Sequence, residues 1–342
     1  MKKFFLSLLL MFCALQSSLP AFELNECFDD ENKIVKATKR IYLSACPGAY
    51  NPSIIQFNDG YLLTFRYLPN RSEESWISYI GIIHLNKSFD PISKIQLLDT
   101  RLYNSSTPSQ SEDARIFSCN NRLYVVYNDN MDLVFPSTWE RRDMYIAELV
   151  YDGRKFIVGE PLKLVHETKY RQSPWQKNWS PFEWNGSLLF SYMISPHEVI
   201  IPDMETGICS PFCMTHKPIM WRHGMIRGGT PAELVDGEYL AFFHSGIITS
   251  SLSSDNQDFW HYFMGAYTFS AEPPFEITGI SQDPIDAPGF YTYSNYNKRV
   301  IYPGGFIVDG ENVYVAYGKD DTEVWIATMD LTGLKKSMKR FQ

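Results

Sequence analysis

The sequence predicts an all-β fold, a five-bladed β-propeller, from three observations. First, a turn pair of Asn or Asp beside Gly or Asn leads into an aromatic and aliphatic run at five places along the chain. Second, another strand-like run that ends in a turn follows each of these. Third, the turns are 51 to 73 residues apart. Repeats of roughly 40–50 residues with several strands are typical of propeller blades, so the extra length indicates loop insertions. A β-sandwich with ordinary Asp-Gly and Asn-Gly hairpins is the alternative.

The five predicted units follow one another in chain order. The second residues of their turn pairs are Gly60, Asn121, Gly186, Gly237 and Gly310. The runs that contain or follow these turns are 58–66, 120–127, 184–193, 235–244 and 308–318. The second runs are 79–90, 144–153, 197–207, 262–275 and 323–333. We therefore expect each turn pair to join two adjacent strands of one blade.

Residues 1–21 have the pattern of a signal peptide. Lys2 and Lys3 give a positively charged start, an apolar core spans 4–15, and small residues lie near a cleavage point at Ala21. The apolar run is short for a membrane span, which needs about 20 residues, and an uncleaved anchor is the alternative. We therefore expect an exported protein, periplasmic or secreted.

The rest of the chain divides into a charged lead-in at 22–48, the propeller domain at 49–333 and a basic, solvated tail at 334–342. No other candidate membrane segment is expected. The formal net charge of −8 argues against nucleic acid as a partner, because phosphate backbones attract basic surfaces. Aromatic residues make up 15% of the chain, a high share that suits sheet cores and also surfaces that stack on sugars.

Five cysteines follow residue 21, and an exported chain can pair some of them. Cys209 and Cys213 are the closest candidates for a disulfide. The odd number leaves at least one cysteine unpaired within a monomer. The spacing of this pair and His216 is not a persuasive zinc pattern, so we expect no metal.

Two adjacent carboxylates and an arginine, Glu112, Asp113 and Arg115, precede a strand-like run. Charge at a loop beside a β segment is how a rigid sheet presents a reactive group. The alternative is a surface turn in which the carboxylates form a local ion pair with Arg115. Arg66 interrupts an apolar strand, which is costly unless its charge is paired or faces a polar cleft.

Lys177 and Asn178 lie among three tryptophans, Trp175, Trp179 and Trp184. Aromatic rings interleaved with hydrogen-bonding side chains are typical of sugar sites, since rings meet the apolar face of a sugar and amides meet its hydroxyls. Core packing with an exposed lysine is the alternative.

Four more residues are candidates, each with a structural alternative. Gly228 and Gly229 allow the backbone to approach a ligand or to turn sharply. His244 ends an aromatic run, where a histidine is commonly structural, and Asp321 follows a strand end with the same alternative.

Five stretches, taken in chain order, resemble those of glycoside hydrolase family 130, the β-mannoside phosphorylases and mannosidases with the related β-1,2-mannosyltransferase/phosphorylases. They are NPSIIQFNDGYLLTFR from residue 51, EDAR at 112–115, KNWSPF at 177–182, IRGGTPAELVDGEYLAFFHS from 226 and YPGGFIVDGENVYVAYGKDD from 302. The resemblance spans about 49–333. It implies a five-bladed propeller, which agrees with the repeat count above.

The resemblance also implies roles for individual residues. Asp113 would be the proton donor, which acts directly or through a sugar hydroxyl. The residues implied in sugar binding are Asn51, Arg66, Arg115, Asn178 and Asp321. Lys177 and His244 would hold phosphate, with Arg227 supplying charge that is lost at Met225, where the phosphorylases tend to have a lysine. The implied substrate is an oligosaccharide or glycan with β-mannosidic bonds. No cofactor is implied, and inorganic phosphate is a candidate co-substrate.

This sequence departs from the family pattern at Ala114, which replaces the motif proline, and at Tyr192 and Met193, which replace a His-Arg pair. The catalytic outcome therefore stays open between phosphorolysis, hydrolysis and transfer. Phosphorolysis needs cations and hydrogen-bond donors around the attacking phosphate, whereas hydrolysis needs a carboxylate that activates water. Export favours hydrolysis or transfer, because a sugar phosphate made outside the cytoplasm is not conserved for metabolism. A non-catalytic carbohydrate-binding propeller is the remaining alternative.

Overall fold

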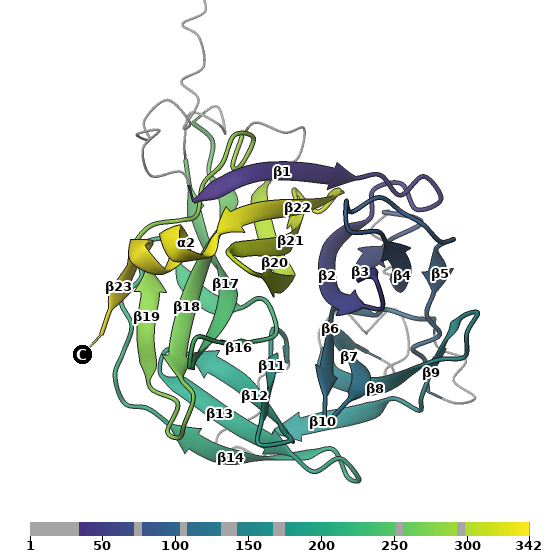
Figure 1. Ribbon diagram of the computed structural model, residues 1–342, viewed down its shortest axis with the longest axis horizontal. Coiled ribbons are helices and arrows are strands. Elements are labelled where there is room, and N and C mark those ends of the chain that lie inside the picture. Colours follow the sequence, from purple (N-terminus) through teal and green to yellow (C-terminus); the bar gives the residue numbers. More distant parts are fainter. Residues whose placement is uncertain are drawn as a thin grey trace, which may run out of the picture.

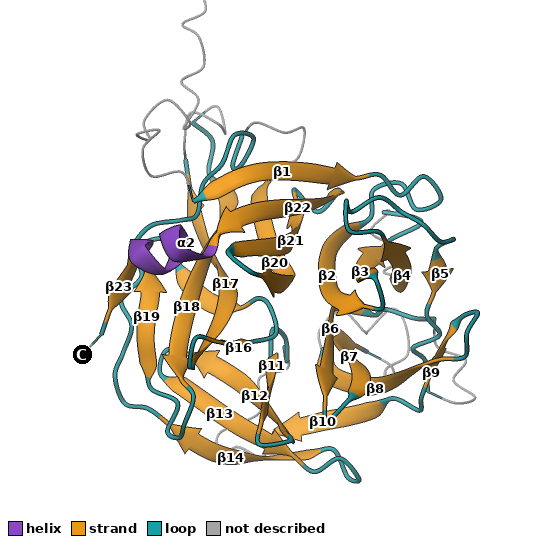
Figure 2. Cartoon of the chain, viewed as in Figure 1, coloured by secondary structure: helices purple, strands orange, loops and turns teal. Residues whose placement is uncertain are grey.

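The computed structural model describes residues 34–71, 77–102, 108–130, 142–166, 175–250, 256–292 and 298–341. Within these ranges the protein is built from β-strands that are arranged around a central region, with a short helix near the C-terminus (Figures 1 and 2). The strands of the first half are β1 (Val35–Ile41), β2 (Tyr50–Phe57), β3 (Gly60–Tyr67), β4 (Tyr79–Leu85), β5 (Gln96–Leu97), β6 (Glu112–Cys119), β7 (Arg122–Asp129), β8 (Asp143–Tyr151), β9 (Phe156–Val158) and β10 (Leu162–His166). The elements of the second half are β11 (Ser180–Trp184), β12 (Ser187–Ile194), β13 (His197–Pro202), β14 (Ile208–Met214), β15 (Met225–Gly228), β16 (Glu233–Val235), β17 (Glu238–Thr249), β18 (Phe259–Ser270), β19 (Ile277–Ser281), β20 (Lys298–Asp309), β21 (Asn312–Lys319), β22 (Glu323–Asp330), α2 (Leu331–Ser337) and β23 (Met338–Arg340). The all-β prediction is confirmed.

Each of the five predicted turn pairs joins two adjacent antiparallel strands. The hairpins are β2–β3, β6–β7, β11–β12, β16–β17 and β20–β21. Their turns contain residues with positive φ, among them Asn121 at 60°, Gly186 at 76° and Gly237 at 82°. Hairpin turns need this left-handed backbone, and Asn, Asp and Gly adopt it most readily. Local turn chemistry therefore explains why the sequence located the hairpins correctly.

Three sheets result from the strand pairing. The four-stranded sheet has the order β2-β3-β4-β5, and the nine- and ten-stranded sheets each contain two hairpin units joined by a parallel pair, β10–β14 and β18–β20. The buried apolar side chains form five clusters, each shared between two strand groups that are neighbours around the ring. One of these clusters joins β2, β3 and β4 to the C-terminal strands, so the core continues where the two ends of the domain meet.

Both ends of the described chain are part of the folded body. β1, within the expected lead-in, pairs with β22 across almost the whole sequence, and β23 pairs with β19. The tail is predicted to be solvated, and for its backbone this is wrong. Leu334 and Met338 are buried and hold the backbone against the sheet. The basic side chains remain at the surface, as Lys335 and Arg340 form ion pairs with acidic residues of the hairpin β16–β17.

The candidate disulfide between Cys209 and Cys213 does not form. Both cysteines are free, as are Cys46 and Cys119, and Cys27 lies outside the described residues. Cys209 and Cys213 stand four positions apart on β14. An extended strand rises about 3.3 Å per residue, which separates them by about 13 Å, whereas a disulfide needs Cα atoms within about 7 Å.

The predicted signal peptide at 1–21 also lies outside the described residues. Among those that are described, no helix is long and apolar enough to span a membrane.

Candidate active site

The two carboxylates of the EDAR stretch lie on a bulge at the start of β6. The register of β6 against β7 shifts between Glu112 and Arg115, and Asp113 has φ of 52°. A bulge inserts an extra residue into one strand and changes the direction of its side chains. Glu112 and Asp113 are both buried, so the surface turn considered as the alternative is not what this sequence forms.

Glu112 is the common partner of three cations. Its Oε1 atom lies 2.6 Å from Nη2 of Arg66 and 2.9 Å from Nη2 of Arg142, and its Oε2 atom accepts a hydrogen bond of 2.7 Å from Nζ of Lys177. Burial works to raise the pKa of Glu112, but Arg66, Lys177 and Arg142 outweigh it and hold that pKa well below its ordinary value. Glu112 is therefore an ionised carboxylate and a weak base.

Asp113 is held by one of its two carboxylate oxygens. Its Oδ1 atom accepts a hydrogen bond of 2.9 Å from Nδ2 of Asn51 and lies 3.6 Å from Nη1 of Arg66. Within the described chain, the Oδ2 atom has no hydrogen-bond partner, which leaves it for a substrate. Asn51 also has positive φ and lies on a register shift in β2, so two bulges on strands of different sheets, β2 and β6, bring this pair together. A Cβ atom at Gly318 would lie 2.3 Å from Oδ1 of Asn51, so only glycine fits beside this amide.

A second buried network surrounds Arg115. Its Nη2 atom donates to Oδ1 of Asn178 at 3.2 Å and to the hydroxyl of Tyr302 at 2.9 Å, and that hydroxyl also donates to Asn178 at 3.1 Å. The guanidinium further donates to the carbonyl oxygens of Gly228 and Gly229. A Cβ atom at Gly228 would lie 2.2 Å from the carbonyl oxygen of Asn178. The paired glycines therefore let the backbone approach this network.

His244 lies against the Arg115 network through Tyr302. The two ring centroids are 4.7 Å apart, and Nδ1 of His244 is buried without a hydrogen-bond partner among the described residues. Burial, with the charges of Arg115 and Arg227, lowers the pKa of His244 to about 3. Its imidazole is therefore neutral at pH 7 and can donate or accept a hydrogen bond. Arg227 is exposed and lies opposite His244 in the register of β15 against β17.

Lys177 and Asp321 complete the predicted set. Lys177 is partly exposed, and its Nζ atom lies 5.3 Å from the ring centroid of Trp175. Asp321 forms an ion pair with Lys298. Burial works to lower the pKa of Arg66, but nearby anions, Asp321 among them, outweigh it and raise that pKa. Arg71 donates a hydrogen bond to the carbonyl oxygen of Asp321 and lies 5.1 Å from the ring centroid of Tyr50, and Arg66 lies 5.1 Å from the same ring.

The structure therefore brings the predicted residues together. Asn51, Arg66, Asp113, Arg115, Lys177 and Asn178 belong to the two hydrogen-bonded networks, His244 joins them by ring contact, and Arg227 and Asp321 lie at their edges. The sequence did not predict Arg142 and Tyr302 as site residues, nor that Glu112 contacts three cations. Arg142 follows another arginine just before a strand, and Tyr302 starts the last family-like stretch, so weak signals for both were present.

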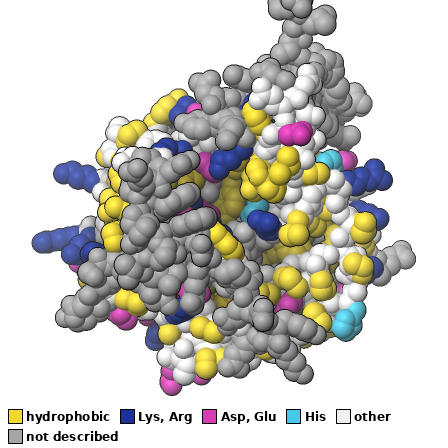
Figure 3. Space-filling view, turned by 180° about the vertical axis from the view of Figure 1, so that it is seen from behind, with side chains coloured by type: hydrophobic (Ala, Val, Ile, Leu, Met, Phe, Trp, Pro, Cys, Tyr) yellow, Lys and Arg dark blue, Asp and Glu magenta, His cyan; other side chains and the backbone are white. Residues whose placement is uncertain are grey.

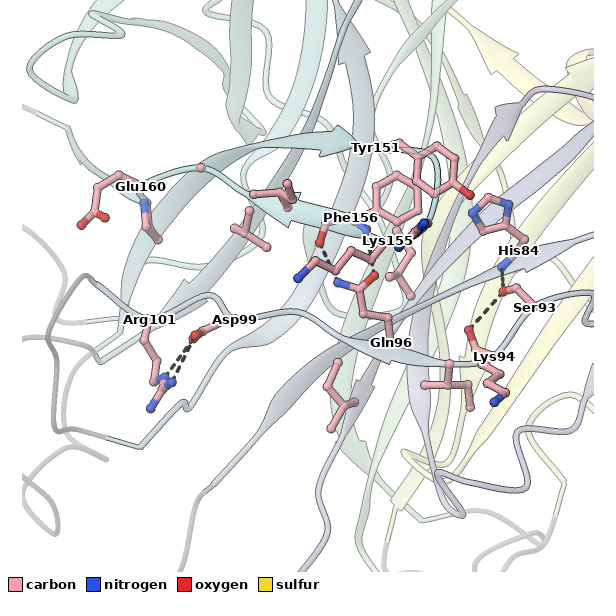
Figure 4. Close-up of a pocket in the computed structure, with 18 of the residues that line it drawn as sticks. His84, Ser93, Lys94, Gln96, Asp99, Arg101, Tyr151, Lys155, Phe156 and Glu160 are labelled. Carbon is pink, nitrogen blue, oxygen red and sulfur yellow. Dashed lines mark hydrogen bonds and ion pairs between the residues drawn. The ribbon is translucent and has the colours of Figure 1, made fainter.

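A large cavity lies away from these networks. It measures about 1160 Å³ between β4–β5 and β8–β9, and it is lined by His84, Gln96, Tyr151 and Phe156 among others (Figure 4). The side-chain amide of Gln96 already forms two hydrogen bonds with the backbone of Phe156. This cavity contains none of the predicted site residues, so the carboxylate and cation networks are what identify the candidate site. The opposite side of the molecule from Figure 1 carries basic and hydrophobic side chains near its middle (Figure 3).

Comparison with known proteins agrees with the resemblance predicted from the five stretches. A family model described as β-1,4-mannooligosaccharide phosphorylase, of glycoside hydrolase family 130, matches residues 31–340. The chain belongs to this family. Its members are glycoside phosphorylases and glycosidases, enzymes that act on mannosides.

Three known proteins illustrate what the chain is similar to. A 1,2-β-oligomannan phosphorylase from a Thermoanaerobacter species is 27% identical over 128 residues, which cover 35% of this chain and 40% of that relative. Two solved structures share the fold: a β-1,2-mannobiose phosphorylase from Listeria innocua in complex with β-1,2-mannobiose, and a GDP-mannose-dependent mannosyltransferase from Leishmania mexicana. The first has a TM-score of 0.58 at 15% identity and covers 91% of this chain and 98% of its own. The second has 0.53 at 12%, with 87% and 90% covered.

Proposed function

We propose that this protein is an enzyme that breaks β-mannosidic bonds with Asp113 as the proton donor. The observation that carries the proposal is the placement of Asp113 on a bulge, with Asn51 and Arg66 at one carboxylate oxygen and the other oxygen open. Glu112, its neighbour, cannot serve as the acid because three cations keep it ionised. Family membership supplies the substrate class.

Phosphate is the nucleophile that the charges favour. The two networks contain four cations, the buried Arg66, Arg115 and Arg142 and the partly exposed Lys177, against two carboxylates. An excess of positive charge and donors suits an attacking oxyanion. A hydrolase needs a carboxylate that removes a proton from water, and Glu112, with its lowered pKa, is a poor base.

The reaction follows from these roles. An oxygen of phosphate attacks the anomeric carbon, the bond from that carbon to the bridging oxygen breaks, and the leaving sugar takes a proton from Asp113 directly or through a hydroxyl. In an inverting reaction, nucleophile and acid act on opposite faces of the sugar ring. We place Lys177, Arg227 and His244 on the side of the phosphate, and Asn51, Arg66, Arg115, Asn178 and Asp321 around the sugar. The products are mannose 1-phosphate and the shortened oligosaccharide.

We also infer that the domain has five blades. The five hairpin units and the five apolar clusters support this count, because each cluster lies between two consecutive units and the last unit meets the first. Export, with residues 1–21 as the signal peptide, is likewise a proposal. Export would place the substrate among glycans outside the cytoplasm and favours hydrolysis or transfer, whereas the charges of the site favour phosphorolysis, so the products must decide between them.

The deciding experiment is product analysis. The purified protein is incubated with β-1,2- and β-1,4-mannobiose, with and without millimolar phosphate. We expect mannose 1-phosphate only when phosphate is present. Free mannose that forms at the same rate without phosphate would mean hydrolysis, and longer oligosaccharides formed from an activated mannosyl donor would mean transfer. An intact protein that yields no product from any of these would contradict the proposed enzyme.

A further inference from the structure

A chain of aromatic rings leads outward from the candidate site along the hairpin β17–β18. It begins at Tyr302, whose hydroxyl bonds to Arg115, and passes to His244 at a centroid distance of 4.7 Å. It continues to Tyr262 at 6.1 Å and then to Trp260 at 5.7 Å. The candidate site already contains the inner two rings, whereas Tyr262 and Trp260 have no role in it.

The outer part of this chain lies on an open face. β17 and β18 pair over twelve residues, with Tyr262 opposite Gly246 and Trp260 opposite Ile248. Residues that are opposite each other in an antiparallel pair share one face of the sheet. Trp260 is 43% exposed and Ile248 is 54% exposed, whereas Ser245, on the other face of β17, is fully buried. Trp260 is therefore presented to solvent and is not part of the core.

Gly246 keeps the two outer rings uncovered. A Cβ atom there would lie 3.3 Å from Cε1 of Tyr262 and 3.5 Å from Cζ3 of Trp260. Gly246 is not among the residues with positive φ, so the backbone does not require glycine at this position. Because Gly246 has no side chain, the rings of Tyr262 and Trp260 stay accessible.

Polar groups flank the same rings. β18 pairs in parallel with β20, which places Lys298 beside Trp260 and Val300 beside Tyr262. Lys298 forms an ion pair with Asp321, one of the residues to which sugar binding is assigned above. Exposed aromatic rings with charged donors and acceptors at their edge suit a pyranose, whose C–H face stacks on a ring while its hydroxyls meet polar groups.

We propose that Tyr262 and Trp260 form an outer sugar subsite that binds a distal unit of a longer mannooligosaccharide. The subsite adjoins the sugar-binding residues through Lys298, which lies beside Trp260 and forms an ion pair with Asp321, so one linear substrate can contact both. The inference rests on the proposed function for the kind of sugar. It adds that the protein prefers substrates longer than a disaccharide.

The test compares chain lengths. Values of kcat/KM are measured for β-linked mannobiose and for the corresponding tetraose, and the ratio of the two is the preference for length. In Trp260→Ala we expect this ratio to fall roughly two- to tenfold, the range of an aromatic stacking contact. Trp260→Tyr should keep most of the preference for length, because tyrosine retains an aromatic ring. Gly246→Val should lower the ratio with Trp260 still present, because the new side chain covers both rings.

Tyr42→Ala is the matched control, since Tyr42 is exposed on the segment after β1 and should leave the ratio unchanged. Calorimetric titration with the tetraose separates this inference from the proposed function. If neither the wild type nor any variant turns over a substrate but Trp260→Ala still weakens tetraose binding, the subsite stands and the proposed activity fails. If wild type turns over both substrates and neither Trp260→Ala nor Gly246→Val changes the ratio, the subsite is wrong and the proposed activity stands. A folded protein that binds no mannooligosaccharide would overturn both.

Discussion

Replacing Glu112 with glutamine should destabilise the fold strongly, because three cations lose their common anion. Arg66 and Arg142 are buried, and their nitrogen atoms lie 2.6 and 2.9 Å from the carboxylate. Removing one partner of a buried ion pair typically costs about 3–5 kcal/mol, since the other charge is left uncompensated. Lys177 is partly exposed and is screened by water, so it adds little. We therefore expect a loss of about 3–5 kcal/mol in the free energy of unfolding.

Equilibrium unfolding in urea at pH 7 measures this loss. Glu148→Gln is the matched control, because Glu148 lies 3.5 Å from Arg122 with both side chains well exposed. Exposed pairs contribute about 0–1 kcal/mol. A loss in Glu112→Gln no larger than that in Glu148→Gln would refute the reasoning, since it would mean that the buried arginines do not depend on this anion.

The same residue makes stability depend on pH. Because the folded-state pKa of Glu112 is lower than the ordinary value of 4.5, its contribution is present above about pH 4.5 and is lost as the pH falls through the folded-state value. The wild-type protein should therefore lose stability on acidification below about pH 4.5, and Glu112→Gln should lose less over the same interval. Unfolding curves at a series of pH values provide the measurement.

Three further predictions concern the candidate site. Asp113→Asn should leave the urea midpoint close to that of wild type and lower turnover by at least ~10²-fold, the usual effect of losing a general acid; unchanged activity would show that Asp113 is not the donor. Lys177→Ala should raise the KM for phosphate more than the KM for the mannoside, and an equal rise in both would move Lys177 away from the nucleophile. The pKa of His244 is lowered to about 3, so the unfolded chain binds a proton that the folded protein does not between about pH 6.5 and 3. Unfolding free energy should fall as the pH drops through this interval, and His244→Gln should flatten that fall; an unchanged profile would count against the buried neutral imidazole.

Much of the fold could be predicted because its signals are local. The turns at Asn121, Gly186 and Gly237 require a backbone that few residues adopt, so short Asn, Asp and Gly motifs located the hairpins. The bulges that carry Asn51 and Asp113 lie inside two of the family-like stretches, so these stretches located the proposed acid and its partner.

Only the tertiary structure decided which distant groups meet. In the sequence Glu112 is only the residue next to Asp113. In the folded protein it is the anion shared by Arg66, Arg142 and Lys177, which come from three separate segments. The pairing of β1 with β22 and the free state of Cys209 were equally out of reach. Charge pairing, strand addition and disulfide geometry depend on distances between residues that are far apart in sequence, or on the extension of a strand between them. A local pattern carries no measure of either.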